Sequence, residues 1–288
     1  MNNDELQVLG TENRKSNNWK WIVAIACVIL TIVCYLIYNR CSSTGNTLPM
    51  SQEGSTISPA LQHAADSLLN DKLTEINGLQ GQVIIMNVQT GEILAMAGRE
   101  RNFEGKFQPC QNFAYQQELG ALTMTVSLLV GLESGKAHLS DVVDTGNGVW
   151  QIDDDRIMKD HNWRKGGYGE VTLDRALGVS SNIGISKTIW SLFKGHEQDY
   201  FNKLDSMSFG QPNSIEGIEG LRPSVYSSPK DSDWVNKVIL WSAIGYNRKI
   251  APIQMLTFYN AIANNGKMVK PTLVPGTAEV VNEQIAKK

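Results

Sequence analysis

Residues 115–133 read YQQELGALTMTVSLLVGLE, and their apolar residues follow the period of a helix. Met124, Leu128 and Leu132 recur at every fourth position, and Val126 and Leu129 lie beside them. This spacing places the large apolar side chains on one face. The segment is therefore predicted to be a buried helix that begins near Gly120.

Two apolar runs upstream have the pattern of a β-hairpin. They are Gly-Gln-Val-Ile-Ile-Met-Asn-Val at 81–88 and Glu-Ile-Leu-Ala-Met-Ala at 92–97. Gln89, Thr90 and Gly91 separate them, and a short connection that contains glycine is typical of a tight hairpin turn.

A helix is predicted ahead of this hairpin. Ser58 followed by Pro59 is a typical helix start, because proline is tolerated at the first helical position. The predicted amphipathic helix runs from Pro59 to Ile76. One face is expected to carry Leu61, Ala65, Leu68, Lys72 and Ile76, with Leu69 and Leu73 beside them.

In this order the blocks resemble the penicillin-binding transpeptidase family. The hairpin is similar to the family's opening signature, Val-x-x-Met-(Asp/Asn)-x-x-Thr-Gly-Glu-Ile-Leu-Ala-Met. The helix after Gly120 resembles the family's active-serine helix, in which Ser-x-x-Lys places a serine and a lysine one turn apart. In this chain the serine position is Ala121 and the lysine position is Met124. Segments 142–148, 180–184, 245–246 and 252–271 also resemble family segments.

The resemblance implies an α/β (α+β) fold of the penicillin-binding and serine β-lactamase type over residues 59–288. The family's second motif, Ser-x-Asn, is intact at Ser180 and Asn182. Its third motif, Lys-Thr-Gly, does not appear. Gly276-Thr277-Ala278 is one candidate for a relic of it, but 279–282 fits better as the connector that precedes the third motif. On that interpretation the last strands and the closing helix are missing, and one edge of the hairpin is left uncovered.

The residues that remain predict a catalytically inactive protein. A serine hydroxyl is a weak nucleophile that needs a base within hydrogen-bonding reach, and neither alanine nor methionine supplies such a group. Other hydroxyls are candidate substitutes. Thr123 and Thr125 have no lysine three residues on, whereas Ser191 with Lys194 and Ser227 with Lys230 satisfy Ser-x-x-Lys by a pattern that is common by chance.

Several polar groups have a simpler structural interpretation. Without partners, Ser180 and Asn182 are expected to be an N-cap and a buried hydrogen-bonding pair. Asp153, Asp154 and Asp155 are expected to form a solvated acidic loop. The scattered histidines are expected on the surface or in loops; they are His63, His138, His161 and His196. No metal site and no cofactor is predicted.

The N-terminal region predicts a membrane anchor. Trp21 to Tyr38 is an uninterrupted apolar run without a charge, close to the ~20 residues that a spanning helix needs. A cleaved signal peptide is the alternative, but its apolar core is usually ~7–15 residues and ends at small residues. This run ends instead at Tyr38-Asn39-Arg40.

Charge around this run predicts its orientation. Arg14, Lys15 and Lys20 precede it, so the positive-inside rule places the N-terminus in the cytoplasm. The expected organisation is a cytoplasmic tail (1–20), a transmembrane anchor (21–38) in the inner membrane, a flexible stalk (39–58) and a partial transpeptidase-like domain in the periplasm (59–288). Cys27, Cys34 and Cys41 lie in or beside the anchor and Cys110 is alone, so no disulfide framework is predicted.

These features limit the function classes. A net charge of −3 gives no indication of nucleic-acid binding. The favoured hypothesis is an inactive relative of peptidoglycan transpeptidases with a binding or scaffolding role. Its expected partners are the inner membrane, peptidoglycan stem peptides or penicillin bound weakly, and cell-wall assembly proteins. The alternatives are an active D,D-transpeptidase-type acyl transferase with an unrecognised nucleophile, and a gene remnant that does not fold.

Overall fold

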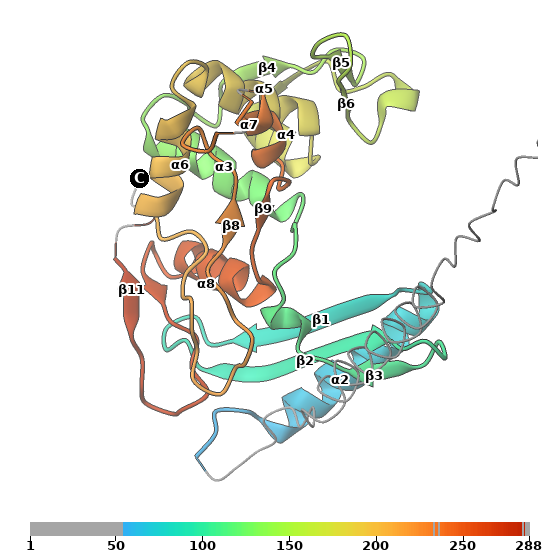
Figure 1. Ribbon diagram of the computed structural model, residues 1–288, viewed down its shortest axis with the longest axis vertical. Coiled ribbons are helices and arrows are strands. Elements are labelled where there is room, and N and C mark those ends of the chain that lie inside the picture. Colours follow the sequence, from blue (N-terminus) through green and yellow to red (C-terminus); the bar gives the residue numbers. More distant parts are fainter. Residues whose placement is uncertain (1–53, 233, 236, 284, 286–288) are drawn as a thin grey trace, which may run out of the picture. The chain divides into compact units, whose positions relative to one another are not determined.

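The computed structural model describes residues 54–232, 234–235, 237–283 and 285 (Figure 1). The predicted tail, the predicted anchor at 21–38 and most of the predicted stalk lie outside this part of the chain. Within it, no helix combines the length and the apolar character needed to cross a membrane. The predicted domain boundaries and the predicted anchor stay predictions.

A three-stranded antiparallel sheet contains the predicted hairpin (Figure 1). The strand order is β1-β2-β3, and the strands are β1 (Gln80–Met86), β2 (Ile93–Arg101) and β3 (Phe107–Pro109). In the connecting turn, the Asn87 side chain accepts hydrogen bonds from the backbone N–H groups of Gln89 (2.9 Å) and Thr90 (3.0 Å). Gly91 has a φ of 75°, a conformation that glycine adopts without strain. The predicted hairpin is confirmed.

Helix α2 (Pro59–Glu75) packs on this sheet, and its position confirms the predicted helix. The predicted face is confirmed at Ala65, Leu69 and Leu73 and is wrong at Leu61, Leu68 and Ile76. The helix buries Ala65, Leu69 and Leu73, which cluster with Ala97 of β2, whereas Leu61, Leu68 and Ile76 are exposed.

Two polar side chains explain this rotation of α2. Gln62 exchanges hydrogen bonds with the backbone of Met96, at 2.8 Å and 3.0 Å, and Asp66 pairs with Arg99 at 2.5 Å. Both partners lie on β2, so Gln62 and Asp66 must face the sheet. Leu69 and Leu73 then face the sheet as well, and Leu61 and Leu68 turn away from it.

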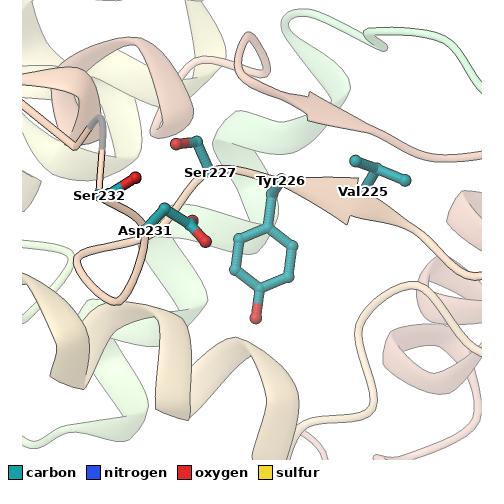
Figure 2. Close-up of a pocket in the computed structure, with 5 residues that line it drawn as sticks. All are labelled: Val225, Tyr226, Ser227, Asp231 and Ser232. Atoms are coloured by element: carbon teal, nitrogen blue, oxygen red, sulfur yellow. The ribbon is translucent and has the colours of Figure 1, made fainter.

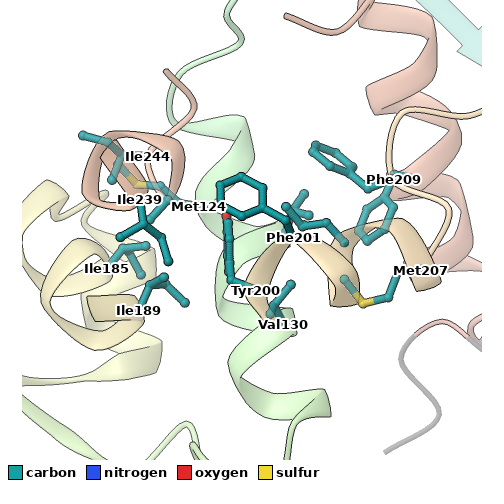
Figure 3. Close-up of a cluster of buried hydrophobic side chains, with 14 of the residues drawn as sticks. Met124, Val130, Ile185, Ile189, Tyr200, Phe201, Met207, Phe209, Ile239 and Ile244 are labelled. Carbon is teal, nitrogen blue, oxygen red and sulfur yellow. The ribbon is translucent and has the colours of Figure 1, made fainter. Parts of the chain in front are cut away.

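The remaining α-helices form a second packed region around α3 (Leu122–Glu133), whose position confirms the predicted buried helix. Two short 3-10 helices are η1 (Asn112–Ala114) and η2 (Trp163–Lys165). The other α-helices are α4 (Leu173–Gly178), α5 (Asn182–Phe193), α6 (Glu197–Ser206), α7 (Val238–Ser242) and α8 (Pro252–Ala263). Met124, Val126 and Val130 of α3 belong to the main buried cluster, together with residues of the helices around it (Figure 3).

A buried hydroxyl pair connects α3 to α6. The Tyr200 hydroxyl lies 2.8 Å from Ser127 Oγ, and both side chains are fully buried. Burial raises the pKa of Tyr200 to about 12, so its hydroxyl stays neutral and can share a proton with the serine. The ring of Tyr200 also makes edge contacts with Phe193 and Phe201. The polar pair is therefore satisfied inside an apolar core.

Four two-stranded antiparallel ladders join loops around the helices. They are β4 (Val142–Asp144) with β7 (Glu170–Thr172), β5 (Val149–Gln151) with β6 (Ile157–Lys159), β8 (Val225–Tyr226) with β9 (Arg248–Lys249), and β10 (Met268–Val269) with β11 (Val280–Asn282). Segment 276–278 lies in the loop between β10 and β11. It is not on a strand, as a relic of the third motif would be.

The rotation of α2 can be tested with two adjacent leucines. Leu69→Ala removes a side chain that is 8 % exposed and packed on the sheet, so we expect a loss of about 2–5 kcal/mol in the free energy of unfolding. Leu68→Ala is the matched control, because Leu68 is 68 % exposed, and its effect should stay within about 0.5 kcal/mol. Denaturant titration of the purified chain measures both. Equal losses, or a larger loss for Leu68→Ala, would contradict the observed rotation.

Candidate functional site

The N-terminal end of α3 carries the two positions that the resemblance assigns to catalysis. Ala121 is the N-cap residue of the helix and is exposed. Met124 is only 2 % exposed, and its side chain lies beside Ile239 and Ile244 in the helical core (Figure 3). The alanine methyl group cannot attack a carbonyl, and a buried thioether cannot take up a proton. The end of α3 therefore has neither a nucleophile nor a base at these two positions.

Backbone contacts hold this end of α3 against the segment that leads into α8. A Cβ on Gly245 would lie 2.0 Å from the carbonyl oxygen of Gly120, so only glycine fits at position 245. Gln117 and Ile250 exchange backbone hydrogen bonds of 3.2 Å and 3.0 Å. In addition, the Tyr259 hydroxyl on α8 donates to the carbonyl of Leu122 at 2.8 Å. These contacts fix the start of α3 without using the side chains of Ala121 and Met124.

The second motif lies at the N-terminus of α5. Ser180 is exposed and has a φ of 51°, whereas Asn182 is the first residue of the helix and is partly exposed. The Asn182 side-chain amide donates to the carbonyl of Lys159 at 2.9 Å. The N-cap is Ser181, whose hydroxyl oxygen accepts from the N–H of Gly184 at 2.9 Å. The expectation that Ser180 is an N-cap and that Ser180 and Asn182 form a buried pair is wrong, because the chain turns through a left-handed conformation at Ser180.

Asp160 is a buried residue that the sequence analysis did not single out. Its side chain is fully buried, and it accepts hydrogen bonds from the Ser181 hydroxyl (2.7 Å) and from the backbone N–H of Ile183 (3.0 Å). Asp160 follows β6 and lies at the positive end of the α5 dipole, where a carboxylate is favoured. It therefore positions the second motif. An isolated aspartate many residues before the motif gives no local sequence signal for this role.

The alternative hydroxyls have other partners. Thr123 is buried, and the Ser191 hydroxyl donates to the carbonyl of Thr188 at 2.8 Å. Lys194, which completes the first alternative pair, lies over the ring of Trp190 at 5.6 Å.

Ser227 lines a shallow cavity of about 530 Å³ together with Val225, Tyr226, Asp231 and Ser232 (Figure 2). In the part of the chain that the structure describes, Lys230 is exposed and does not line this cavity. A serine activated by a lysine three residues on is therefore not formed at either alternative site.

The acidic loop differs from its prediction at Asp153, whereas Asp154 and Asp155 are exposed as expected. Asp153 is not a free solvated carboxylate, because it pairs with Arg156 (2.5 Å) and with Lys237 (2.9 Å). Hydrogen bonds from Arg156 and from Lys237 hold the pKa of Asp153 well below its usual range. Asp153 thus connects the turn between β5 and β6 to the segment before α7 through its ion pair with Lys237. Within the described residues no group of His, Cys, Asp or Glu side chains could hold a metal ion.

The predictions for histidine and cysteine can be compared with the described chain. All four histidines are exposed, as expected; they are His63, His138, His161 and His196. Cys110 is free and buried, and burial raises its pKa to about 11. A thiol with a raised pKa carries little thiolate at neutral pH and is a poor nucleophile.

Comparison with known proteins connects this site to a family. Residues 81–288 match the model of the penicillin binding protein transpeptidase domain. The chain belongs to this family. The family assignment made from the hairpin, the α3 segment and the second motif is thus confirmed.

Relatives of known name share about a quarter of their residues with the chain. The probable peptidoglycan D,D-transpeptidase PbpC of Pseudomonas aeruginosa is 25% identical over an alignment of 221 residues that covers 74% of this chain and 37% of that protein. Peptidoglycan D,D-transpeptidase FtsI of Escherichia coli K12 is 23% identical over an alignment of 228 residues that covers 73% of this chain and 35% of FtsI. The chain thus spans about a third of the length of these relatives.

Solved structures of the family share the fold. The transpeptidase domain of Burkholderia pseudomallei penicillin-binding protein 3 aligns with a TM-score of 0.67 at 20% identity, over 83% of this chain and 67% of that chain. Penicillin-binding protein 2B of Streptococcus pneumoniae R6 also aligns with a TM-score of 0.67, at 18% identity, over 80% of this chain and 43% of that chain. The fold is the α/β transpeptidase fold of penicillin-binding proteins.

The role of Asp160 in this family member can be tested directly. Asp160→Ala would leave the Ser181 hydroxyl and the Ile183 N–H buried without an acceptor, so we expect a loss of about 2–5 kcal/mol in stability. Asp160→Asn keeps one acceptor oxygen and should lose less. Denaturant unfolding measures both variants. The proposed role would be wrong if Asp160→Ala unfolded at the same denaturant concentration as the parent chain.

Proposed function

We propose that this protein takes part in peptidoglycan assembly as a non-catalytic member of the penicillin-binding family. The observation that carries the proposal is the end of α3, where Ala121 replaces the nucleophile and Met124 is buried in the core. The named relatives are peptidoglycan D,D-transpeptidases, which supports cell-wall synthesis as the setting. The proposed location is the inner membrane, with residues 21–38 as the anchor and the described region in the periplasm.

Acyl transfer needs several groups at once. A serine must lose its proton to a base as it attacks, and donors must stabilise the oxyanion that forms. Loss of one key group of such a set removes nearly all chemistry beyond that of binding and the oxyanion site. The Ser191 hydroxyl is bonded to the Thr188 carbonyl, and Lys194 lies over the ring of Trp190. Lys230 does not line the cavity at Ser227. These contacts argue against an active transferase that uses Ser191 or Ser227.

Binding is the function that the remaining groups support. Ser180 is exposed, and the Asn182 side chain keeps its carbonyl oxygen as an acceptor while its amide is held by Lys159. An extended peptide is rich in N–H and C=O groups that such side chains can bind. We propose weak, non-covalent binding of a peptidoglycan stem peptide here, with penicillin as a weaker ligand and cell-wall assembly proteins as partners of the same protein.

A labelled penicillin tests the absence of catalysis. We expect no covalent adduct with the parent chain, because no hydroxyl stands at position 121. Ala121→Ser should also stay unlabelled, since the thioether of Met124 cannot remove the serine proton. Gel fluorescence after denaturation measures the adduct, with an active penicillin-binding protein as the positive control. Stoichiometric labelling of the parent chain would show that an unrecognised nucleophile is active.

Binding is tested separately, with a stem pentapeptide that ends in D-Ala-D-Ala. We expect saturable binding by isothermal titration calorimetry, weakened at least about tenfold by Asn182→Ala, a loss of about 1.4 kcal/mol. Asn202→Ala is the matched control, because Asn202 is an exposed residue of α6. Equal effects of the two variants would contradict a role for Asn182.

The experiment also addresses the alternative that the chain is a remnant that does not fold. Thermal unfolding of the same sample should be cooperative, and the peptide should raise the midpoint because it binds only the folded state. A sample without a cooperative transition would favour the remnant hypothesis.

A further inference from the structure

The segment that begins at the end of β6 holds the second motif and also carries two exposed cations. The carbonyl of Lys159 accepts the Asn182 side-chain amide at 2.9 Å, and Asp160 accepts the Ser181 hydroxyl at 2.7 Å. The backbone N–H of Trp163 then donates to the carbonyl of Asp160 at 3.1 Å. The start of α5 and this segment are therefore fixed relative to each other.

The two cations lie against one tryptophan ring. Lys159 Nζ and the guanidinium carbon of Arg164 are each 4.4 Å from the centroid of the Trp163 ring. Lys159 and Arg164 are exposed, whereas Trp163 is partly buried. A cation over an aromatic ring is attracted by the negative face of that ring. The indole thus holds two positive charges in defined places beside the second motif.

The backbone that carries this ring is closely packed. A Cβ on Gly148, just before β5, would lie 2.9 Å from the Cα of Trp163. A Cβ on Gly167 would lie 2.2 Å from the carbonyl carbon of Asn147. Backbone therefore lies directly on backbone on both sides of η2. A support of this kind places the two cations before any ligand arrives, which lowers the entropic cost of binding one.

The two charges lack an acidic partner within the part of the chain that the structure describes. None of the ion pairs there includes Lys159 or Arg164. The carboxylate of Asp160, next to Lys159 in sequence, is buried and accepts from groups at the start of α5. Because both cations contact the same ring, they are closer together than the Debye length of about 10 Å at 0.1 M salt. Their repulsion is only partly screened, and an anion bound between them relieves it.

The position of the cluster separates it from other charged and apolar features. Lys159 pairs with Val149 in the β5–β6 ladder, whereas the acidic turn at 153–155 closes the opposite end of that hairpin. Figure 1 shows β5 and β6 on the side of the helical region that is far from the three-stranded sheet. The cluster is thus next to the start of α5 and remote from the sheet.

We propose that Lys159 and Arg164 form a subsite for a carboxylate group of the peptide that binds at Asn182. The inference rests on the peptide binding proposed above and adds the charge of the ligand. An extended peptide advances about 3.3–3.6 Å per residue, so a carboxylate two residues from the contact with Asn182 is about 7 Å away. It reaches the cluster, because the cluster begins at the residue to which Asn182 is bonded.

Charge complementarity is the reason for choosing an acidic peptide as the ligand. Lysine and arginine donate charge-assisted hydrogen bonds to a carboxylate, and these are stronger than bonds between neutral groups. An amide in the same place could accept a hydrogen bond but would leave the repulsion between Lys159 and Arg164 uncompensated. The subsite therefore discriminates between a free carboxylate and an amide on otherwise identical peptides.

Calorimetry of the full-length chain in detergent with two pentapeptides tests the subsite. Both peptides end in D-Ala-D-Ala, and the second residue is D-glutamate in one and D-glutamine in the other. We expect the parent to bind the acidic peptide at least about tenfold more tightly at low salt, and this preference to shrink at about 1 M salt because exposed charges are then screened. Lys159→Gln combined with Arg164→Gln should bind both peptides with the parent's affinity for the amide peptide.

Matched variants separate the effect of charge from that of structure. Lys136→Gln combined with Lys194→Gln removes two exposed cations that also lie over aromatic rings, at 5.2 Å and 5.6 Å, and should keep the tenfold preference. Lys159→Arg combined with Arg164→Lys should keep it as well, because both side chains stay cationic. The ratio of the two affinities is measured on the same folded protein, so a change in stability alone does not alter it.

The outcomes distinguish this inference from the proposed function. No binding of either peptide to the parent would overturn the proposed peptide site and the subsite together. Equal affinity of the parent for the two peptides, or a preference that survives the loss of both cations, would overturn the subsite alone. Saturable binding of inorganic phosphate without a preference for the acidic peptide would assign the cluster to a phosphate ligand and would also overturn it.

Discussion

The burial of α3 is the constraint on which the helical region depends. Met124, Val126, Leu128 and Val130 are each at most 2 % exposed, so side chains from several neighbouring helices must fit around this one helix. The one buried hydroxyl in its middle, Ser127, is satisfied by Tyr200 rather than by water. A helix enclosed in this way tolerates uncharged side chains of the right volume and excludes an unpaired charge. The absence of a base at position 124 is therefore a property of the packing as well as of the sequence.

Much of this arrangement could be predicted from sequence because the signals are local. The hairpin at β1 and β2 combines two short apolar runs with a turn whose glycine adopts a positive φ. The helix at α3 has the spacing of a buried face, and its glycine lies just before the first turn. Such signals depend on neighbouring residues alone, and they are sufficient to indicate the family.

The features that could not be predicted depend on distant partners. The rotation of α2 follows from Gln62 and Asp66, whose partners Met96 and Arg99 are on a strand far along the chain. The spacing of apolar residues predicted that Leu61 and Leu68 lie on the buried face of α2. This spacing contains no information about hydrogen bonds to distant residues. The role of Asp160 could not be predicted for the same reason, since its partners, Ser181 and Ile183, belong to another segment.

The contacts that hold the starts of α3 and α5 are separate from the side chains at the two positions that the resemblance assigns to catalysis. The start of α3 is held by backbone contacts at Gly120, Gly245 and Ile250, and the start of α5 is held by Asp160 through a serine and a backbone N–H. None of these contacts involves the side chains at 121 and 124. A lysine at 124 would have to be charged and paired inside an apolar core, which costs several kcal/mol when the pairing is imperfect. Methionine fills the same space without that cost and leaves the backbone contacts at the starts of α3 and α5 unchanged.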